Sequence, residues 1–286
     1  MEADICGFFN EVNHDWMSKI LELRIGEPRI IRLIQRMLKG GILEEGLIKA
    51  SEKGTPQGSI VSPLLSNIYL RYALDEWFSN IFQQRCRGEA YIYRFADDFV
   101  AGFQYQTEAE SYLRALDQRV RRFGLELAPE KTRCMEFGCF ARGGARKRGE
   151  KPKEFTFVGF THYCGKTRRG CFKVKRRTNG KKMGQSLRRF ADWAKSSRSW
   201  LSQGEMLPRA RTRVIGHLNY YAITDNADQC DRFVYYATPL LFKWLNRKSQ
   251  RRAYPWEGFN HALEHVGWPK PRIRIDLSPF RRAEAY

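Results

Sequence analysis

Apolar residues recur at helical spacing along the first third of the chain. Residues 14–39 carry this pattern, and Gly26 and Pro28 interrupt it, so we expect two helices there. The stretch GTPQGSIVSPLLSNIYLRYALDEWF (54–78) opens as a Gly/Pro-rich loop and then predicts a helix. The run EADICGFF at the start is apolar and favours a buried strand.

The next segment combines strand patterns with one further helix. AYIYRFADDFVAGF (90–103) indicates two strands joined by a polar turn, which is a hairpin. Thr107 and Glu110 predict a capping box at the start of a helix that Gly124 ends, and TRCMEF (132–137) predicts another strand. The order β-α-α-hairpin-α-β is that of the split βαβ, or ferredoxin-like, α+β plan.

In this plan the hairpin turn lies at the rim of the sheet, near the end of the first strand. Asp97 and Asp98 occupy the turn region, and Asp4 is the only aspartate in the first strand. The plan therefore permits the three carboxylates to meet.

The second half of the chain has a different pattern. ARGGARKRGEKPK (141–153) is a basic, Gly-rich connector, and residues 154–175 indicate two strands around a turn. Beyond them the pattern is helical, with helices expected at 183–203, 207–222, 229–248 and 256–265. We therefore expect two domains, 1–175 and 176–286, the second mostly α-helical.

Charge divides the chain in the same way. The 286 residues carry a net charge of +20. Residues 1–140 hold 18 Lys and Arg against 20 Asp and Glu, whereas residues 141–286 hold 33 against 11. Such an excess favours a polyanionic partner, and nucleic acid fits better than a membrane surface, because no single basic amphipathic anchor is present.

The seven cysteines suggest neither zinc nor disulfides. They form no CxxC pair, so a structural zinc site and a disulfide framework are both disfavoured. No signal peptide and no run of eighteen apolar residues appears, so we expect an intracellular, cytoplasmic protein.

The aspartate pair is the first candidate for chemistry. A DD dipeptide alone is weak evidence, but here it lies between two strand patterns, where carboxylates carry a desolvation cost unless something neutralises them. Mg²⁺ prefers carboxylate oxygens, and two such ions can support phosphoryl transfer.

Several motifs together carry a family resemblance. ADICGFF, GTPQGSIVSPLLSNIYL, YRFADDFV, PEKTR and FVGF occur in the order of a reverse-transcriptase palm, with FADD where that family usually has YADD. More narrowly, the chain resembles a group II intron reverse transcriptase/maturase. IGHLNYYAITDN (215–226) and LLFKWLNRKSQRRAYPWEGF (240–259) resemble the thumb and maturase domain of that family.

The resemblance implies roles for individual residues. Asp4, Asp97 and Asp98 would hold two Mg²⁺ ions, with the Ile5 carbonyl as a further ligand. Phe9 would exclude a ribose 2′-OH and so favour dNTPs. The remaining implied residues are Gln57 and Gly58, which would line the template and incoming nucleotide, and Lys131, which would lie near the triphosphate and protonate pyrophosphate.

In the tail, cations interleave with Tyr and Trp, a combination that neutralises phosphates and stacks on bases. We expect RNA contacts from Arg209, Arg211, Arg213, Asn219, Tyr220, Lys243, Arg247, Arg251 and Arg252.

The expected function is therefore RNA-directed DNA polymerisation with maturase activity, which aids intron RNA splicing and mobility. The partners would be group II intron RNA, an RNA template with a DNA primer, and dNTPs.

Only three residues precede Asp4, where this family has a fingers region, and Asn10 stands where an aspartate is usual. The alternative is a truncated RNA-binding maturase or relic without polymerase activity. A retron-type enzyme is disfavoured by the maturase-like tail. A zinc-type DNA endonuclease is not expected either, because no Cys/His cluster follows the maturase-like region.

Overall fold

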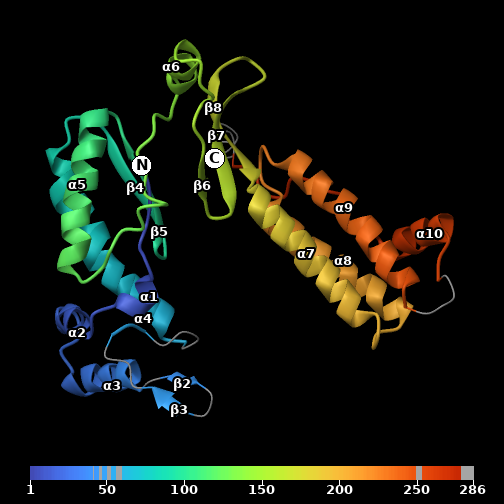
Figure 1. The fold of residues 1–286 in the computed structure, drawn as a ribbon, viewed down its shortest axis with the longest axis horizontal. Coiled ribbons are helices and arrows are strands. Elements are labelled where there is room, and N and C mark those ends of the chain that lie inside the picture. The colour runs from blue at the N-terminus through green and yellow to red at the C-terminus, as the bar shows by residue number, and fades with distance from the viewer. Residues whose placement is uncertain (41, 45–46, 50–52, 56–59, 249–252, 278–286) are drawn as a thin grey trace, which may run out of the picture. The chain divides into compact units, whose positions relative to one another are not determined.

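The chain divides into two units, Met1–Glu136 and Phe137–Tyr286. The computed structural model describes residues 1–40, 42–44, 47–49, 53–55, 60–248 and 253–277 (Figure 1). The sequence analysis expects a functional domain boundary after residue 175. That boundary differs from the division after Glu136 and stays a prediction.

The first unit is built on a three-stranded antiparallel sheet. Its strands are β1 (Glu2–Asp4), β4 (Ala90–Phe95) and β5 (Asp98–Phe103), in the order β1-β5-β4. A fourth strand would lie beside β1, but the chain there forms only a single bridge, between Arg133 and Glu2. The order is that of the split βαβ plan, but the strand expected at 132–137 is wrong, because the chain there meets β1 only at this bridge.

The first strand is shorter than its apolar pattern predicts. It ends at Asp4, and Gly7 then adopts a left-handed backbone conformation with φ of 52°. This conformation turns the chain directly into a short helix, α1 (Phe8–Glu11), so the second half of EADICGFF is not a strand.

The two helices expected within 14–39 are confirmed. They are α2 (His14–Glu22), capped by the Asn13 side chain, and α3 (Pro28–Lys39), capped by the Glu27 side chain. A hairpin that the sequence did not predict follows, formed by β2 (Ile42–Glu44) and β3 (Leu47–Lys49).

The helix expected after the Gly/Pro-rich loop is also confirmed, and it runs further than predicted. α4 (Ser62–Leu70) continues through the π-helical turns η1 (Arg71–Asp75) and η2 (Phe78–Phe82) to η3 (Gln83–Arg85). α5 (Gln106–Arg122) then packs against β5 and η1.

The predicted capping box of α5 is wrong. Tyr105 is the N-cap residue and supplies no side-chain hydrogen bond, which places Thr107 inside the helix. The predicted end is confirmed, since Gly124 follows with φ of 73° and donates a hydrogen bond to the Arg121 carbonyl.

The core of the first unit lies between the sheet and these helices. Ala3, Phe99 and Ala101 point inward from the strands and are fully buried. Tyr69 of α4 donates a buried hydrogen bond of 2.5 Å to the Phe123 carbonyl and joins the two long helices. This packing fixes the strands that carry the aspartates.

The second unit combines a sheet with a helical region. Helix α6 (Ala141–Lys147) lies within the segment expected to be a plain connector, and three strands follow where we predicted two: β6 (Phe155–Phe157), β7 (Phe160–Lys166) and β8 (Phe172–Thr178). The four expected helices are confirmed as α7 (Gly180–Ser197), α8 (Gln203–Tyr221), α9 (Ala227–Asn246) and α10 (Trp256–Val266). They share one apolar core.

Across the described residues, no helix combines the length and apolar character needed to cross a membrane.

Candidate active site

Asp4 and Asp98 lie directly opposite each other in the sheet. The antiparallel register of β1 and β5 pairs these two residues, and Asp98 is also paired with Phe95 across the hairpin. Directly opposed residues have Cβ atoms about 4.5–5.5 Å apart. The fold therefore brings together two carboxylates that are more than ninety positions apart in sequence.

Asp97 reaches the same rim through a tight turn. Only Ala96 and Asp97 separate β4 from β5. Ala96 takes φ of 54°, a left-handed conformation that costs a residue with a side chain about 1–2 kcal/mol. Strain of this kind persists only where the surroundings hold it in place.

Arg94 is the residue that holds the turn, and the sequence analysis missed it. Its Nε and Nη2 donate to the two carboxylate oxygens of Asp75 at 2.8 and 2.6 Å. Its Nη1 donates to the Ala96 carbonyl and to Asn67 Oδ1, both at 3.0 Å. Arg94 thus ties the strained turn to the helix behind it.

Lys131 is brought to Asp4 by a loop that runs along the end of β1. Ala128 N–H donates to the Asp4 carbonyl at 2.9 Å, and Cys6 N–H donates to the Glu126 carbonyl at 2.8 Å. These bonds direct Lys131 Nζ to Asp4 Oδ2, with which it forms an ion pair. The ion pair raises the pKa of Lys131.

The cluster holds more negative charge than one lysine offsets. The pKa of Asp98 is raised from its ordinary value of 3.8 to about 6, first by burial and then by the nearby carboxylates of Asp4, Glu2 and Asp97, while Lys131 acts in the opposite direction. A site of this kind favours an added cation.

A cavity of about 470 Å³ opens beside these groups. Five of the predicted site residues line it together: Asp4, Ile5, Phe9, Asp97 and Lys131. Asn10, which departs from the family pattern, lines it as well.

The loop that begins with Gly54 docks against the α1 segment. Gly54 N–H donates to the Val12 carbonyl and Thr55 N–H to the Phe9 carbonyl, both at 2.7 Å. A Cβ on Gly54 would lie 2.8 Å from the Phe9 and Asn10 carbonyl oxygens, and φ is 81°, so only glycine fits. The two predicted nucleotide-site residues of this loop, Gln57 and Gly58, lie outside the described residues.

The donor set suits a hard divalent cation, but the side chains are not arranged around one. Among the described residues, no group of three or more His, Cys, Asp or Glu stands ready to hold a metal ion. Asp4 Oδ2 instead meets Lys131. The carboxylate oxygens and the charge near Asp98 fit Mg²⁺, provided that Lys131 moves away from Asp4 when the ion binds.

The sheet face that carries Asp4 and Asp98 also carries a row of aromatic side chains. Tyr91, Tyr93 and Phe95 alternate along β4 and are 49%, 64% and 63% exposed. The row ends at Phe95, the partner of Asp98. The alternation in YIYRF is the sequence signal that could have found it.

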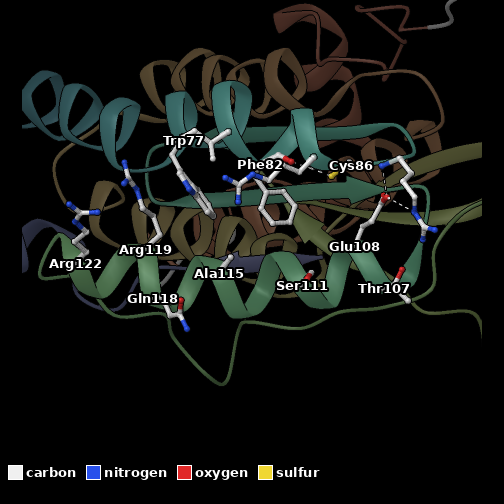
Figure 2. A pocket seen from close by; sticks show the side chains of 13 residues that line it. Trp77, Phe82, Cys86, Thr107, Glu108, Ser111, Ala115, Gln118, Arg119 and Arg122 are labelled. Carbon is white, nitrogen blue, oxygen red and sulfur yellow. Dashed lines mark hydrogen bonds and ion pairs between the residues drawn. The ribbon is translucent and has the colours of Figure 1, made fainter.

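A second cavity, of about 780 Å³, lies between η2 and α5 (Figure 2). Trp77 and Phe82 line one wall, and Glu108 accepts a hydrogen bond of 2.7 Å from Arg87 N–H at one end. None of the predicted site residues lines this cavity.

In the second unit, predicted RNA contacts lie over tryptophan rings. The Arg209 guanidinium is 5.5 Å from the Trp200 ring centre, and that of Arg213 is 4.6 Å from the Trp193 ring centre. Lys243 and Arg247 flank Trp244 at 5.3 and 5.6 Å. Both predicted features of this tail, cations and large aromatic rings, therefore occur side by side.

Other predicted contacts already have partners within the fold. Arg211 donates to the Gly267 carbonyl at 2.9 Å, Tyr220 donates to the Val158 carbonyl at 2.9 Å, and the Asn219 side chain accepts from Arg274. Asn219 and Tyr220 remain exposed. Arg251 and Arg252 lie outside the described residues.

Comparison with known proteins places this arrangement in a family. A profile of the reverse transcriptase (RNA-dependent DNA polymerase) family matches residues 1–162. Three curated relatives match shorter segments: the group II intron-encoded protein LtrA of Lactococcus lactis (40% identity, 27% of this chain and 13% of the relative), an uncharacterized 91 kDa protein in the cob intron of Schizosaccharomyces pombe (44%, 28% and 10%) and Protein YkfC of Escherichia coli (34%, 38% and 36%).

These matches span between 10% and 36% of the relatives' own lengths. The family profile, in contrast, covers more than half of this chain, including both strands of the aspartate hairpin, the first strand and Lys131. The chain therefore belongs to the reverse transcriptase (RNA-dependent DNA polymerase) family, and its homologues include group II intron-encoded proteins.

Proposed function

We propose that the chain is an RNA-directed DNA polymerase of the group II intron type, which extends a DNA 3′-OH on an RNA template. The observation that carries the proposal is the direct pairing of Asp4 with Asp98, one residue from the Asp97 turn, in a chain of this family. In the reaction, the primer 3′-hydroxyl gives up its proton to solvent, its oxygen bonds to the α-phosphorus of a dNTP, and the bond from that phosphorus to the pyrophosphate breaks.

Asp4, Asp97, Asp98 and the Ile5 carbonyl would hold Mg²⁺ in this enzyme. When bound, the two ions would activate the attacking hydroxyl and stabilise the charge on the leaving oxygen. The family gives the expectation of Mg²⁺, and the supporting observation is the surplus of carboxylate charge at the rim of the sheet.

The chain's own residues would perform the remaining tasks. Lys131 carries three protons on an exposed ammonium group that lines the cavity, so it can give one to the departing pyrophosphate. The Phe9 ring lines the same cavity and would exclude a ribose 2′-OH, which selects dNTPs over NTPs. Gln57 and Gly58 would line the template and the incoming nucleotide.

The second half of the chain would supply the maturase activity. We assign the palm to residues 1–175 and the helical thumb and maturase domain to 176–286. The cations beside Trp193, Trp200 and Trp244 support binding to intron RNA, because they offer phosphate neutralisation and stacking surfaces together.

Primer extension tests the polymerase. The protein is incubated with an RNA template, a DNA primer, dNTPs and Mg²⁺, and the extended primer is measured. Asp97→Asn should reduce extension at least about a thousandfold, because this variant loses a charged group at the reacting centre. Asp117→Asn is the matched control, since this half-exposed aspartate of α5 pairs with Arg121 and lines neither cavity, and it should extend normally. Extension that survives Asp97→Asn would refute the proposal.

A second function is favoured by a specific observation. Asp4 is neutralised by Lys131, and the described side chains form no ready cation site, which is compatible with an RNA-binding maturase that has no live polymerase. In that case the wild-type protein would give no extension, while Arg209→Gln with Arg213→Gln would still weaken binding to intron RNA.

A further inference from the structure

A row of cations runs along one side of α3. Arg29, Arg32, Arg36 and Lys39 follow one another at intervals of three, four and three residues, which places all of them on one side of the helix. All four are exposed. We call them the α3 row.

The α3 row stands out against the charge of its surroundings. Residues 1–140 contain 18 Lys and Arg and 20 Asp and Glu, so this part of the chain is slightly acidic. α3 supplies four of those cations and no carboxylate. The row is therefore a local concentration of positive charge in a part of the sequence that is otherwise acidic.

Among the side chains that the structure describes, no carboxylate neutralises the cations of the row. Within the part of the chain that the structure describes, none of the four forms an ion pair with a carboxylate. Between these four side chains and the described residues, one hydrogen bond forms, a long one of 3.4 Å from Arg32 Nε to the Pro28 carbonyl. Arg32, Arg36 and Lys39 also line a shallow hollow of about 310 Å³, together with Gln35.

The helix beneath the row is held in place. Ile31 and Leu38 are buried on its opposite side, and Gln35 donates a hydrogen bond of 3.0 Å to Ser18 of α2. Because the helix backbone is fixed, the four side chains project along a line of about 15 Å, given a rise of about 1.5 Å per residue.

The composition of α3 decides which polyanion fits. The helix has no Phe, Tyr or Trp, so it lacks the stacking surfaces that single-strand binding uses. A line of cations without aromatic rings instead suits the phosphates of a duplex, which a protein contacts without reading bases.

We propose that the α3 row binds the sugar-phosphate backbone of a folded, double-helical RNA. The proposal rests on the proposed function in one respect, namely that the partner is an RNA. It gives the first unit its own RNA-binding surface, in addition to the residues predicted in the second unit.

The same helix offers a matched control. Ile30, Leu33 and Met37 form an exposed apolar row beside the cations, with exposed fractions of 47%, 52% and 46%. Substitutions there change the surface of α3 without removing a charge.

The test measures binding of a labelled RNA hairpin by fluorescence anisotropy over a series of salt concentrations. Arg32→Gln with Arg36→Gln should weaken binding about tenfold at low salt and should lower the slope of log K against log salt by about 2, one for each lost phosphate contact. Leu33→Gln with Met37→Gln should leave both values unchanged. A DNA duplex of the same sequence serves as a second probe, and a smaller loss on DNA would show that RNA geometry, beyond charge, is recognised.

An unchanged slope in the Arg32/Arg36 variant would overturn the proposal, as would an equal loss of affinity in the Leu33/Met37 variant. Helical content, measured by circular dichroism, shows that each variant is folded. Polymerase activity does not enter this measurement, so a failure of primer extension and a failure of the α3 row are separate results.

Discussion

Arg94 and Asp75 form a two-point ion pair, with N–O distances of 2.8 and 2.6 Å, directly behind the aspartate turn. The same guanidinium donates to the Ala96 carbonyl, so the pair fixes the residue that precedes Asp97. The position of the carboxylates thus depends on an arginine whose side chain is only 12% exposed.

Arg94→Met should destabilise the protein by about 2–4 kcal/mol, because it leaves Asp75 with no cation in a partly buried site. Urea unfolding measures the loss. Arg71→Met is the matched control. Arg71 lies in η1, as Asp75 does, and pairs with Glu76 at 3.2 Å in a more exposed position, so its loss should cost less than about 1 kcal/mol. Equal effects of the two substitutions would contradict the role assigned to Arg94.

Two glycine substitutions should act in opposite directions. Gly54→Ala should destabilise by at least about 2 kcal/mol, since its backbone is left-handed and two carbonyl oxygens lie where the methyl group would go. Gly216→Ala, inside α8 with open space around it, should stabilise by about 0.5–1 kcal/mol. Thermal unfolding of the two variants checks both signs, and an unchanged or raised melting temperature of Gly54→Ala would contradict the role given to the Gly54 contact.

The raised pKa of Asp98, about 6, makes stability depend on pH. The folded protein binds this proton more tightly than the unfolded chain does, so the group favours folding below about pH 4, and this contribution is lost as the pH rises through about 6. Asp98→Asn should therefore be more stable than wild type at about pH 8, by about 1 kcal/mol after allowance for solvent screening at a half-buried site. The melting temperatures should converge at about pH 4. A gap that is the same at both pH values would contradict this account.

Lys131 should compete with a metal ion for Asp4. In the absence of nucleotide, Lys131→Met should bind Mn²⁺ about threefold more tightly than wild type, because removal of an exposed ion-pair partner frees the Asp4 carboxylate. The same variant should extend primers more slowly, since it has lost the proposed proton donor. Mn²⁺ titration followed by electron paramagnetic resonance separates these two effects. Weaker Mn²⁺ binding would show that Lys131 supports the ion instead of competing with it.

The local patterns in the sequence predicted the elements that carry the site. The alternation in YRFADDFV indicates two strands with aspartates between them, and the split βαβ order then places Asp4 nearby. The structure confirms the hairpin, but its turn consists of Ala96 and Asp97 alone: Asp98 begins β5 and is paired with Asp4, a register that the sequence permitted but did not predict. The hairpin and the nearness of Asp4 are recoverable because one short motif and one rule of topology determine them.

The features that the sequence did not predict depend on partners far along the chain. Arg94 resembles any polar strand residue until its partner in η1 is known, and TRCMEF has a strand pattern but meets β1 only at Arg133. The helix at Ala141–Lys147 was hidden by its glycines, which suggest a loop. Tertiary contacts override local preference in each case.

The central claim is that Asp4, Asp97 and Asp98 bind divalent ions at the rim of the sheet, and Mn²⁺ titration in the presence of a dNTP tests it most directly. The account predicts that wild-type protein binds about two ions, and that Asp4→Asn and Asp97→Asn each lose this binding while Asp117→Asn retains it. Equal Mn²⁺ binding by all four proteins would contradict the claim.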